Sequence, residues 1–252
     1  MMLKPFACAA ALLCFAWSAP SHAETRGVAV VELFTSQGCS SCPPADRVLA
    51  ELDAEARRTG QPVFILSYHV DYWNRLGWTD PFSSAEASQR QREYAHLFRS
   101  NRIYTPQMIV NGVNPFVGSD ERLARRAVSH ALQAHAKTEV TLGSPVIQGQ
   151  TVSVTVRLPD PLGDNHRLMV ALTQHGLGND VPRGENRGRH LTHAGVVRAF
   201  ANHTATAGEQ TVDLTLPDPI DADYRVVAFV QSVKTGQIHG ATMRPVPAPE
   251  DG

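Results

Sequence analysis

The sequence has few cysteines: four in 252 residues. Two of them, Cys8 and Cys14, lie in the apolar segment at the N-terminus, so Cys39 and Cys42 are the only thiols in the rest of the chain. A framework of several disulfides is therefore excluded. A chain of this length also builds a core without a covalent bridge, so a purely structural Cys39–Cys42 bond would contribute little.

The sequence also lacks an excess of charge of either sign. It carries 23 basic and 24 acidic residues, a formal net charge of −1 at pH 7, and has no basic stripe. Nucleic acids are therefore not expected partners. A glycine-rich phosphate-binding loop is missing too, so we expect no organic cofactor.

The one long apolar run, Phe6 to Trp17, lies at the N-terminus after a single lysine. Ser21 and Ala23 are small residues at the positions that signal peptidase reads, so residues 1–23 are predicted to be a secretory signal peptide. The run is too short for a membrane anchor. We expect cleavage after Ala23 and a periplasmic or secreted protein that is not inserted in the membrane.

The pair Cys39-x-x-Cys42 follows a valine-rich run and a glycine. Two cysteines at this spacing can close a small ring, and the N-terminus of a following helix stabilises the thiolate of the first. The pattern indicates a redox dithiol in which Cys39 attacks and Cys42 resolves. An inert local disulfide and a metal site are the alternatives; with His69, the two thiolates would suit Cu(I).

Strand and helix signals alternate in the first half of the mature chain, which predicts a βαβ unit and then a hairpin. The expected elements are strands at 27–34 and 62–67, helices at 44–58, 83–100 and 120–136 with Ser83 as the N-cap of the second, and a hairpin at 103–117 around Asn111-Gly112. From Thr138 onward about seven short alternating runs predict an antiparallel β-sandwich. We therefore expect domains at 24–137 and 138–252, with a boundary near Lys137.

Four segments together resemble a known family. They are Val31–Asp46 (VELFTSQGCSSCPPAD), Ser67–Trp73 (SYHVDYW), Tyr104–Met108 (YTPQM) and Gly184–Arg189 (GENRGR). They look like the secreted, thioredoxin-like bacterial family catalogued as domain of unknown function 1223. The resemblance implies an α/β thioredoxin-like domain followed by the all-β domain, but it implies no particular activity.

The resemblance also implies roles for residues outside the cysteine pair. Pro106 would be a cis-proline facing the sulfurs, and Thr105 and Pro106 would hold a substrate strand by backbone hydrogen bonds. Tyr104 and Trp73 are further candidates for substrate binding, although an aromatic residue after a strand can equally belong to the local core. Two prolines directly after Cys42 depart from the thioredoxin pattern and place the expected helix start at about Cys42.

Polar residues after the second strand are candidates for proton transfer. His69 and Asp71 share a face if that strand continues, and either would have to lie within hydrogen-bond reach of Cys42. Alternatively, both bind loop backbone. The donor-rich segment Gly184–His193 suits a carboxylate or a sugar, or is a long hairpin loop.

These features predict an exported thiol-disulfide oxidoreductase that acts through Cys39 and Cys42. Its partners would be protein or small-molecule thiols and disulfides, together with an unidentified redox partner. Two alternatives stay open. One is a periplasmic Cu(I)-binding module or metallochaperone that uses Cys39, Cys42 and His69, and the other is a non-catalytic envelope interaction protein that binds through its second domain.

Overall fold

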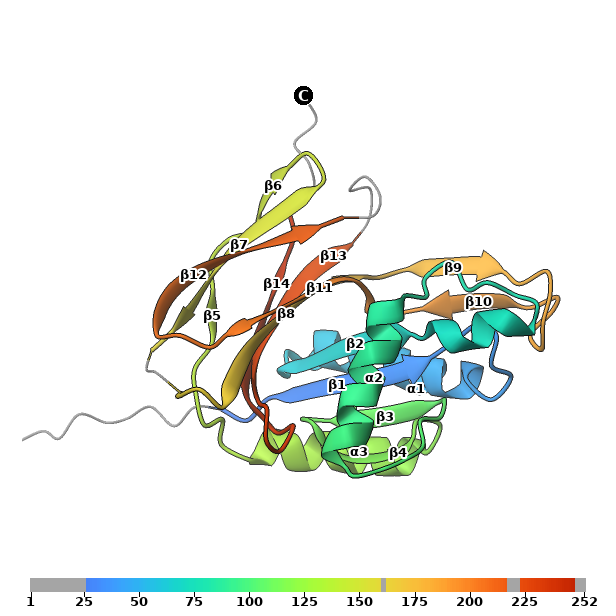
Figure 1. Cartoon of the computed structure of the whole chain (residues 1–252), viewed down its shortest axis with the longest axis horizontal. Helices are drawn as coiled ribbons and strands as arrows, with labels where there is room; N and C mark the ends of the chain where they lie inside the picture. The colour runs from blue at the N-terminus through green and yellow to red at the C-terminus, as the bar shows by residue number, and fades with distance from the viewer. Residues whose placement is uncertain (1–25, 160–161, 217–222, 248–252) are drawn as a thin grey trace, which may run out of the picture.

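A computed structural model describes residues 26–159, 162–216 and 223–247 (Figure 1). The predicted signal peptide lies outside these residues. Of the described residues, 42% are in strands and 23% in helices, and one eight-stranded mixed sheet runs through both halves of the chain. The expected α/β thioredoxin-like domain followed by a separate sandwich is therefore wrong.

The large sheet has the strand order β14-β13-β8-β11-β2-β1-β3-β4. Its strands are β1 (Ala29–Thr35), β2 (Val63–His69), β3 (Gln107–Val110), β4 (Val113–Val117), β8 (His166–Gln174), β11 (Val196–Thr204), β13 (Tyr224–Ser232) and β14 (Ile238–Pro245). A smaller sheet contains β5 (Thr141–Leu142), β6 (Val146–Gln148), β7 (Thr151–Leu158) and β12 (Gly208–Thr215). The hairpin β9 (Leu177–Asp180) and β10 (His190–His193), the helices α1 (Pro43–Thr59), α2 (Ala85–Leu97) and α3 (Glu121–Gln133), and the 3₁₀ helix η1 (Asp71–Leu76) complete the fold.

The two halves of the chain join where β11 pairs with β2. The pairing is parallel, with Val196 opposite Ser67, and Ser67 N donates to Gly195 O at 2.7 Å. Strand β2 also pairs with β1 on its other side, so it lies inside the sheet. In a separate first domain β2 would be an edge with unpaired backbone groups, and β11 satisfies some of them.

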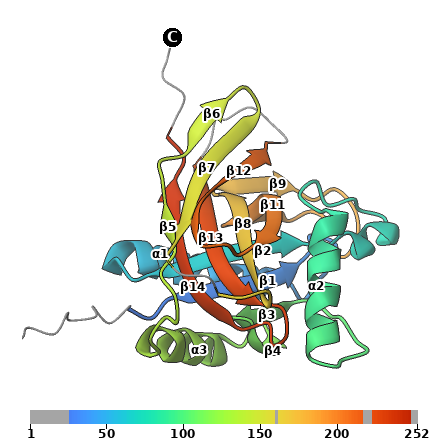
Figure 2. The same cartoon turned by 60° about the vertical axis from the view of Figure 1, so that its left-hand side comes forward.

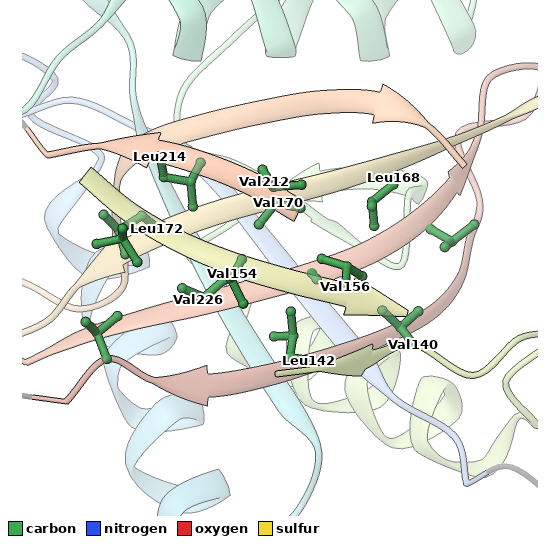
Figure 3. Close-up of a cluster of buried hydrophobic side chains, with 14 of the residues drawn as sticks. Val140, Leu142, Val154, Val156, Leu168, Val170, Leu172, Val212, Leu214 and Val226 are labelled. Carbon is green, nitrogen blue, oxygen red and sulfur yellow. The ribbon is translucent and has the colours of Figure 1, made fainter. Parts of the chain in front are cut away.

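Three clusters of apolar side chains fill the spaces between the layers of the fold. Helices α1 and α3 pack on one face of β1, β2 and β3, around Leu33 and Leu49. Helix α2 covers the opposite face, around Phe34 and Tyr94 (Figure 2). The small sheet packs on β8 and β13 (Figure 3), so the second half does contain two β layers, but one of them belongs to the large sheet.

The sequence located several of the local elements correctly. Strands β3 and β4 form the predicted hairpin around Asn111. Gly112 has a φ of +70°, and a Cβ there would meet Gly236 O at 1.8 Å, so this turn requires glycine. The N-cap of α2 is Ser84 and not Ser83, because Ser84 Oγ accepts a hydrogen bond from Ala87 N at 3.0 Å. Strand β9 was not among the expected elements, but its hairpin with β10 makes most of Gly184–His193 the long hairpin loop considered above.

A buried charge pair connects helix α2 to two strands of the large sheet. Arg90 on α2 donates to Glu32 Oε1 on β1, from Nε at 3.0 Å and from Nη2 at 2.9 Å. Its Nη1 donates to Gln231 Oε1 on β13 at 2.8 Å, and Tyr94 contacts both charged groups. Since β13 comes from the second half of the chain, this cluster ties the two halves together.

A second charged cluster lies between α1 and the second half. Asp53 on α1 accepts a hydrogen bond from Arg225 Nη1 at 3.3 Å and lies 3.5 Å from His175 Nδ1. Burial raises the pKa of Asp53, but His175, followed by Arg225, outweighs burial and holds that pKa below 3.8. The carboxylate therefore contributes to stability above about pH 4, and this contribution is lost as the pH falls.

The Asp53→Asn variant is expected to be less stable than the wild type near pH 6, because it lacks the carboxylate. It should also lose less stability on acidification, because an amide at this position has no proton to gain. Urea unfolding at pH values from about 6 to 2 measures this. The exposed Asp213 on β12 gives the matched control, Asp213→Asn, which should keep the wild-type slope. Parallel curves for wild type and Asp53→Asn would contradict the assignment.

Candidate functional site

Cys39 and Cys42 form a disulfide, with their Cα atoms 5.4 Å apart. They follow the end of β1 in a tight turn, where Cys39 N donates to Ser36 O and Cys42 N donates to Cys39 O. Helix α1 begins at Pro43 with Cys42 as its N-cap, because proline fits the first helical positions, where no N–H is needed. Cys39 therefore precedes the helix.

Both cysteines have no exposed surface, whereas the two serines between them are exposed. The loop between β9 and β10 lies over the turn. Its buried Asn186 donates from Nδ2 to Gln37 O and to Cys39 O, each at 2.9 Å, and Glu185 Oε2 accepts from Ser40 N at 3.0 Å. Part of the segment Gly184–His193 thus closes the site, and neither a carboxylate nor a sugar is needed to explain its polarity.

Gln37 connects the cysteine turn to two other segments. Its backbone N donates to Asp80 Oδ2 at 2.8 Å. Its side-chain Nε2 contacts Asn179 Oδ1 at 2.6 Å and His193 Nε2 at 3.0 Å, and Trp78 Nε1 donates to Gln37 Oε1 at 3.1 Å. Because the amide donates to His193 Nε2, the proton of a neutral His193 lies on Nδ1.

His69, at the end of β2, pairs with Asp80. The distance from Nδ1 to Asp80 Oδ2 is 2.7 Å, and both side chains are completely buried. Burial lowers the pKa of His69, but the Asp80 carboxylate outweighs burial and raises it above 6.5. Burial likewise raises the pKa of Asp80, and His69 outweighs it, so that pKa is lowered. Each group of the pair therefore favours the charged form of the other.

Asp46 lies one helical turn after Cys42, on the same side of α1, and its N donates to Cys42 O at 3.1 Å. Burial, opposed by the charge of His69, raises the pKa of Asp46 to about 7. His193 Nδ1 lies 3.9 Å from Asp46 Oδ2, and burial lowers the pKa of His193 to about 3, so this ring is neutral. Asp46 is therefore a carboxyl group that exchanges its proton near pH 7.

Four buried atoms in and around this acid have no hydrogen-bond partner within the described ranges. They are Asp46 Oδ1, Thr35 Oγ1, His69 Nε2 and His193 Nδ1. The rings of His69 and His193 meet edge to face, with centroids 4.5 Å apart. Unpartnered polar atoms of this kind are uncommon in protein interiors and cluster where chemistry requires them.

Of the substrate-binding residues expected from the sequence, Trp73 contacts the cysteine turn and also binds Thr105. The Thr105–Pro106 peptide bond is cis, as the resemblance implies. Trp73 Nε1 donates to Thr105 Oγ1 at 2.8 Å, and Trp73 Cβ lies against the backbone of Gly38, where an added Cβ would come within 3.1 Å. Tyr104 is partly exposed and its carbonyl accepts from Gln91 Nε2, so its contact is with α2.

The expected proton-transfer pair is split. Strand β2 ends at His69, and Asp71 opens η1, so the two side chains do not share a strand face. Asp71 binds Ser88 on α2 through Oδ1 and N. His69 belongs to the buried cluster beside Asp46, whereas Asp71 does not.

The three residues considered as copper ligands are bonded to other groups in this structure. Within 26–159, 162–216 and 223–247 the structure contains no group of three or more His, Cys, Asp or Glu side chains placed to hold a metal ion. Cys39 and Cys42 are bonded to each other, and His69 Nδ1 is bonded to Asp80. No described helix is long and apolar enough to span a membrane.

Several site residues were not anticipated from the sequence. Asp46 had a weak signal, because it follows Cys42 by four residues and would share its helix face. No sequence signal places Asp80, His193 and Asn186 near the cysteines, because only the tertiary fold brings them there. Asn186, for example, is 147 positions away from Cys39.

The chain was compared with known proteins. A search of curated proteins returned no match. Protein AGR_C_4864 from Agrobacterium tumefaciens, known from a crystal structure, is similar at 28% identity, over 90% of this chain and 98% of that one, with a TM-score of 0.64.

Two further similarities are to parts of β-glucuronidases. The enzyme from Ruminococcus gnavus is 10% identical over 46% of this chain and 16% of that one, and enzyme 2 from Bacteroides uniformis is 13% identical over 45% and 15%. Both have a TM-score of 0.25, which is too low to support any inference. The family model described as "Protein of unknown function (DUF1223)" matches residues 30–231, which is most of the chain, and the chain therefore belongs to the DUF1223 family.

Proposed function

We propose that the protein is an exported thiol-disulfide oxidoreductase whose reactive group is the Cys39–Cys42 pair. The observation that carries this proposal is the buried carboxyl of Asp46, with a pKa of about 7, one turn after Cys42. A structural disulfide does not need a proton acceptor. A dithiol does, because each cysteine must lose its proton before it can attack.

In the reducing direction, the thiolate of Cys39 attacks one sulfur of a substrate disulfide. A bond forms between Cys39 Sγ and that sulfur, the substrate S–S bond breaks, and the other substrate sulfur leaves as a thiolate. Ser41 Oγ lies 3.4 Å from Cys39 Sγ and can donate a weak hydrogen bond to the thiolate. The product is a mixed disulfide on Cys39.

Cys42 then completes the exchange. Its thiol gives its proton to the Asp46 carboxylate, and the resulting thiolate attacks Cys39 Sγ. The Cys39–Cys42 bond forms, the mixed disulfide breaks, and the second substrate sulfur leaves as a thiolate, so two electrons pass from the dithiol to the substrate. In the oxidising direction the same steps run backwards.

The His69–Asp80 pair supports this role of Asp46. The positive charge of a protonated His69 favours the ionised form of Asp46, whereas burial favours the neutral form, and the balance sets the pKa of Asp46 near neutrality. Thr105 and Pro106 would hold the substrate, with Trp73 fixing the Thr105 side chain. We propose that the relation to thioredoxin-like proteins is confined to this local site.

The proposal is tested by the reduction potential of the pair in the mature protein, residues 24–252, equilibrated with glutathione. We expect a value between about −120 and −270 mV and a Cys39 pKa below about 7.5, as in catalytic dithiols. Thiolate absorbance in the Cys42→Ser variant gives that pKa, and Cys39→Ser is the matched control.

A potential below about −300 mV with an unshifted Cys39 pKa would instead mean a structural bridge and would end the enzyme proposal. The envelope interaction protein would then be the better account. Loss of function in the double variant Cys39→Ala, Cys42→Ala, without loss of the fold, separates the two accounts independently.

A further inference from the structure

The sulfurs of the disulfide cannot be reached in the described structure. Exchange requires a thiolate to approach one sulfur along the S–S axis, so access to that sulfur limits the rate. Cys39 and Cys42 both have no exposed surface, and Asn186 and Glu185 occupy the backbone groups around Cys39. Some part of the protein must therefore move before either sulfur reacts.

We infer that residues 181–189 form a movable cationic cover over the disulfide and that this cover favours small thiols carrying a carboxylate. We refer to residues 181–189 as the cover. The inference rests on the proposed function, because it names the substrate class of that site. Figure 1 shows the β9–β10 hairpin, which carries the cover, reaching the end of the sheet where β1 stops.

The bonding pattern of the cover allows it to move as one piece. Its two ends are bonded to each other, since Val181 N donates to Arg189 O at 2.9 Å and Gly188 N donates to Val181 O at 2.8 Å. The bonds from the cover to the cysteine turn are those of Asn186 and Glu185. Breaking these few hydrogen bonds would release the cover from the cysteine turn.

The charge of the cover points to its substrate. Arg183, Arg187 and Arg189 are exposed, and Glu185 is the one acidic residue of the segment, which leaves an excess of two positive charges in a chain of net charge −1. Glu185 is already engaged, because hydrogen bonds from the Ser40 side chain and from Ser40 N lower its pKa. A positive surface beside a buried reactive group raises the local concentration of anions.

The test uses three dithiol reductants of similar size and different charge: dimercaptosuccinate, dithiothreitol and dithiobutylamine, which are anionic, neutral and cationic. The rate of reduction of the oxidised mature protein is measured by alkylation and mass change, and is divided by the thiolate concentration of each reagent. We expect dimercaptosuccinate to react about fivefold faster than dithiothreitol at low salt, with the difference lost at about 1 M salt.

Two variants separate the parts of the inference. Asn186→Ala removes two hydrogen bonds that hold the cover and should raise the rate with all three reagents about tenfold. The double variant Arg183→Ala, Arg187→Ala should abolish the preference for dimercaptosuccinate. Arg126→Ala, an exposed arginine on α3, is the matched control and should change neither result.

Glu185→Ala is the second test of the cover, because its side chain is exposed and its loss should not disturb the fold. It should raise the rate with dithiothreitol a few fold. Unchanged rates in Asn186→Ala and Glu185→Ala, or equal rates for the three reagents with the wild type, would overturn the inference. Failure of the proposed function would appear instead in the reduction potential, which these relative rates do not depend on.

Discussion

The Asp46→Asn variant is expected to form a mixed disulfide at the wild-type rate but to resolve it about 100-fold more slowly near pH 7.5. An amide cannot accept the proton of Cys42, and a positioned general base typically contributes a factor of about 10² to 10⁴. The measurement reacts the reduced protein with oxidised glutathione, quenches it in acid and quantifies the mixed disulfide by mass spectrometry. Asp53→Asn, the same substitution at another buried position of α1, should resolve normally.

Stability gives Asp46 a second, independent signature. Its pKa is raised in the folded protein, from 3.8 to about 7, so folding favours the protonated form. The protonated Asp46 carboxyl therefore makes its full contribution to the free energy of unfolding below about pH 4, and this contribution is lost as the pH rises to about 7. Asp46→Asn should therefore be more stable than the wild type near pH 8, by about 2–4 kcal/mol. A variant that is less stable at this pH, or that resolves the mixed disulfide as fast as the wild type, would refute the role.

Arg90→Met is expected to lower the free energy of unfolding by about 3–5 kcal/mol. The substitution leaves the carboxylate of Glu32, which has no exposed surface, buried without its partner, and isolated buried charges are costly. Urea unfolding measures the loss. The double variant Glu32→Leu, Arg90→Met removes both charges and should recover much of it.

Arg125 provides the matched control for Arg90. It is within 4 Å of three carboxylates, those of Glu51, Glu55 and Glu121, but its side chain is 41% exposed. Exposed ion pairs typically contribute less than about 1 kcal/mol. Arg125→Met should therefore cost far less than Arg90→Met, and equal losses would show that burial is not what makes the Arg90 pair important.

The sequence predicted local features better than the overall architecture. The hairpin around Asn111 and the helix after Cys42 depend on neighbouring residues, namely a turn dipeptide and an apolar face of helical period. The continuous sheet depends on the pairing of Val196 with Ser67, and a run of apolar residues does not reveal its partner strand. For this reason a domain boundary was expected near Lys137, whereas β2 of the first half pairs with β11 of the second inside one sheet.

The candidate site shows the same limit. Cys39, Cys42 and the cis bond before Pro106 were identified from motifs that are contiguous in sequence. His69 was singled out together with Asp71 for a shared strand face, but the carboxylate that binds His69 is that of Asp80. Strand β2 stops at His69, and the chain then turns through η1 and brings Asp80 back to the imidazole. The alternation of apolar and polar residues along a strand does not show where the strand ends and such a turn begins.

The distance along the chain between the cysteines and their cover sets an order of events during synthesis. A nascent chain emerges N-terminus first, so Cys39 and Cys42 appear well before Asn186, which follows Cys39 by 147 residues. The pair can be enclosed only after residues 177–193 have been made, because β9 and β10 carry the cover. Enclosure of the two sulfurs is therefore a late step of folding, which cannot precede synthesis of the second half of the chain.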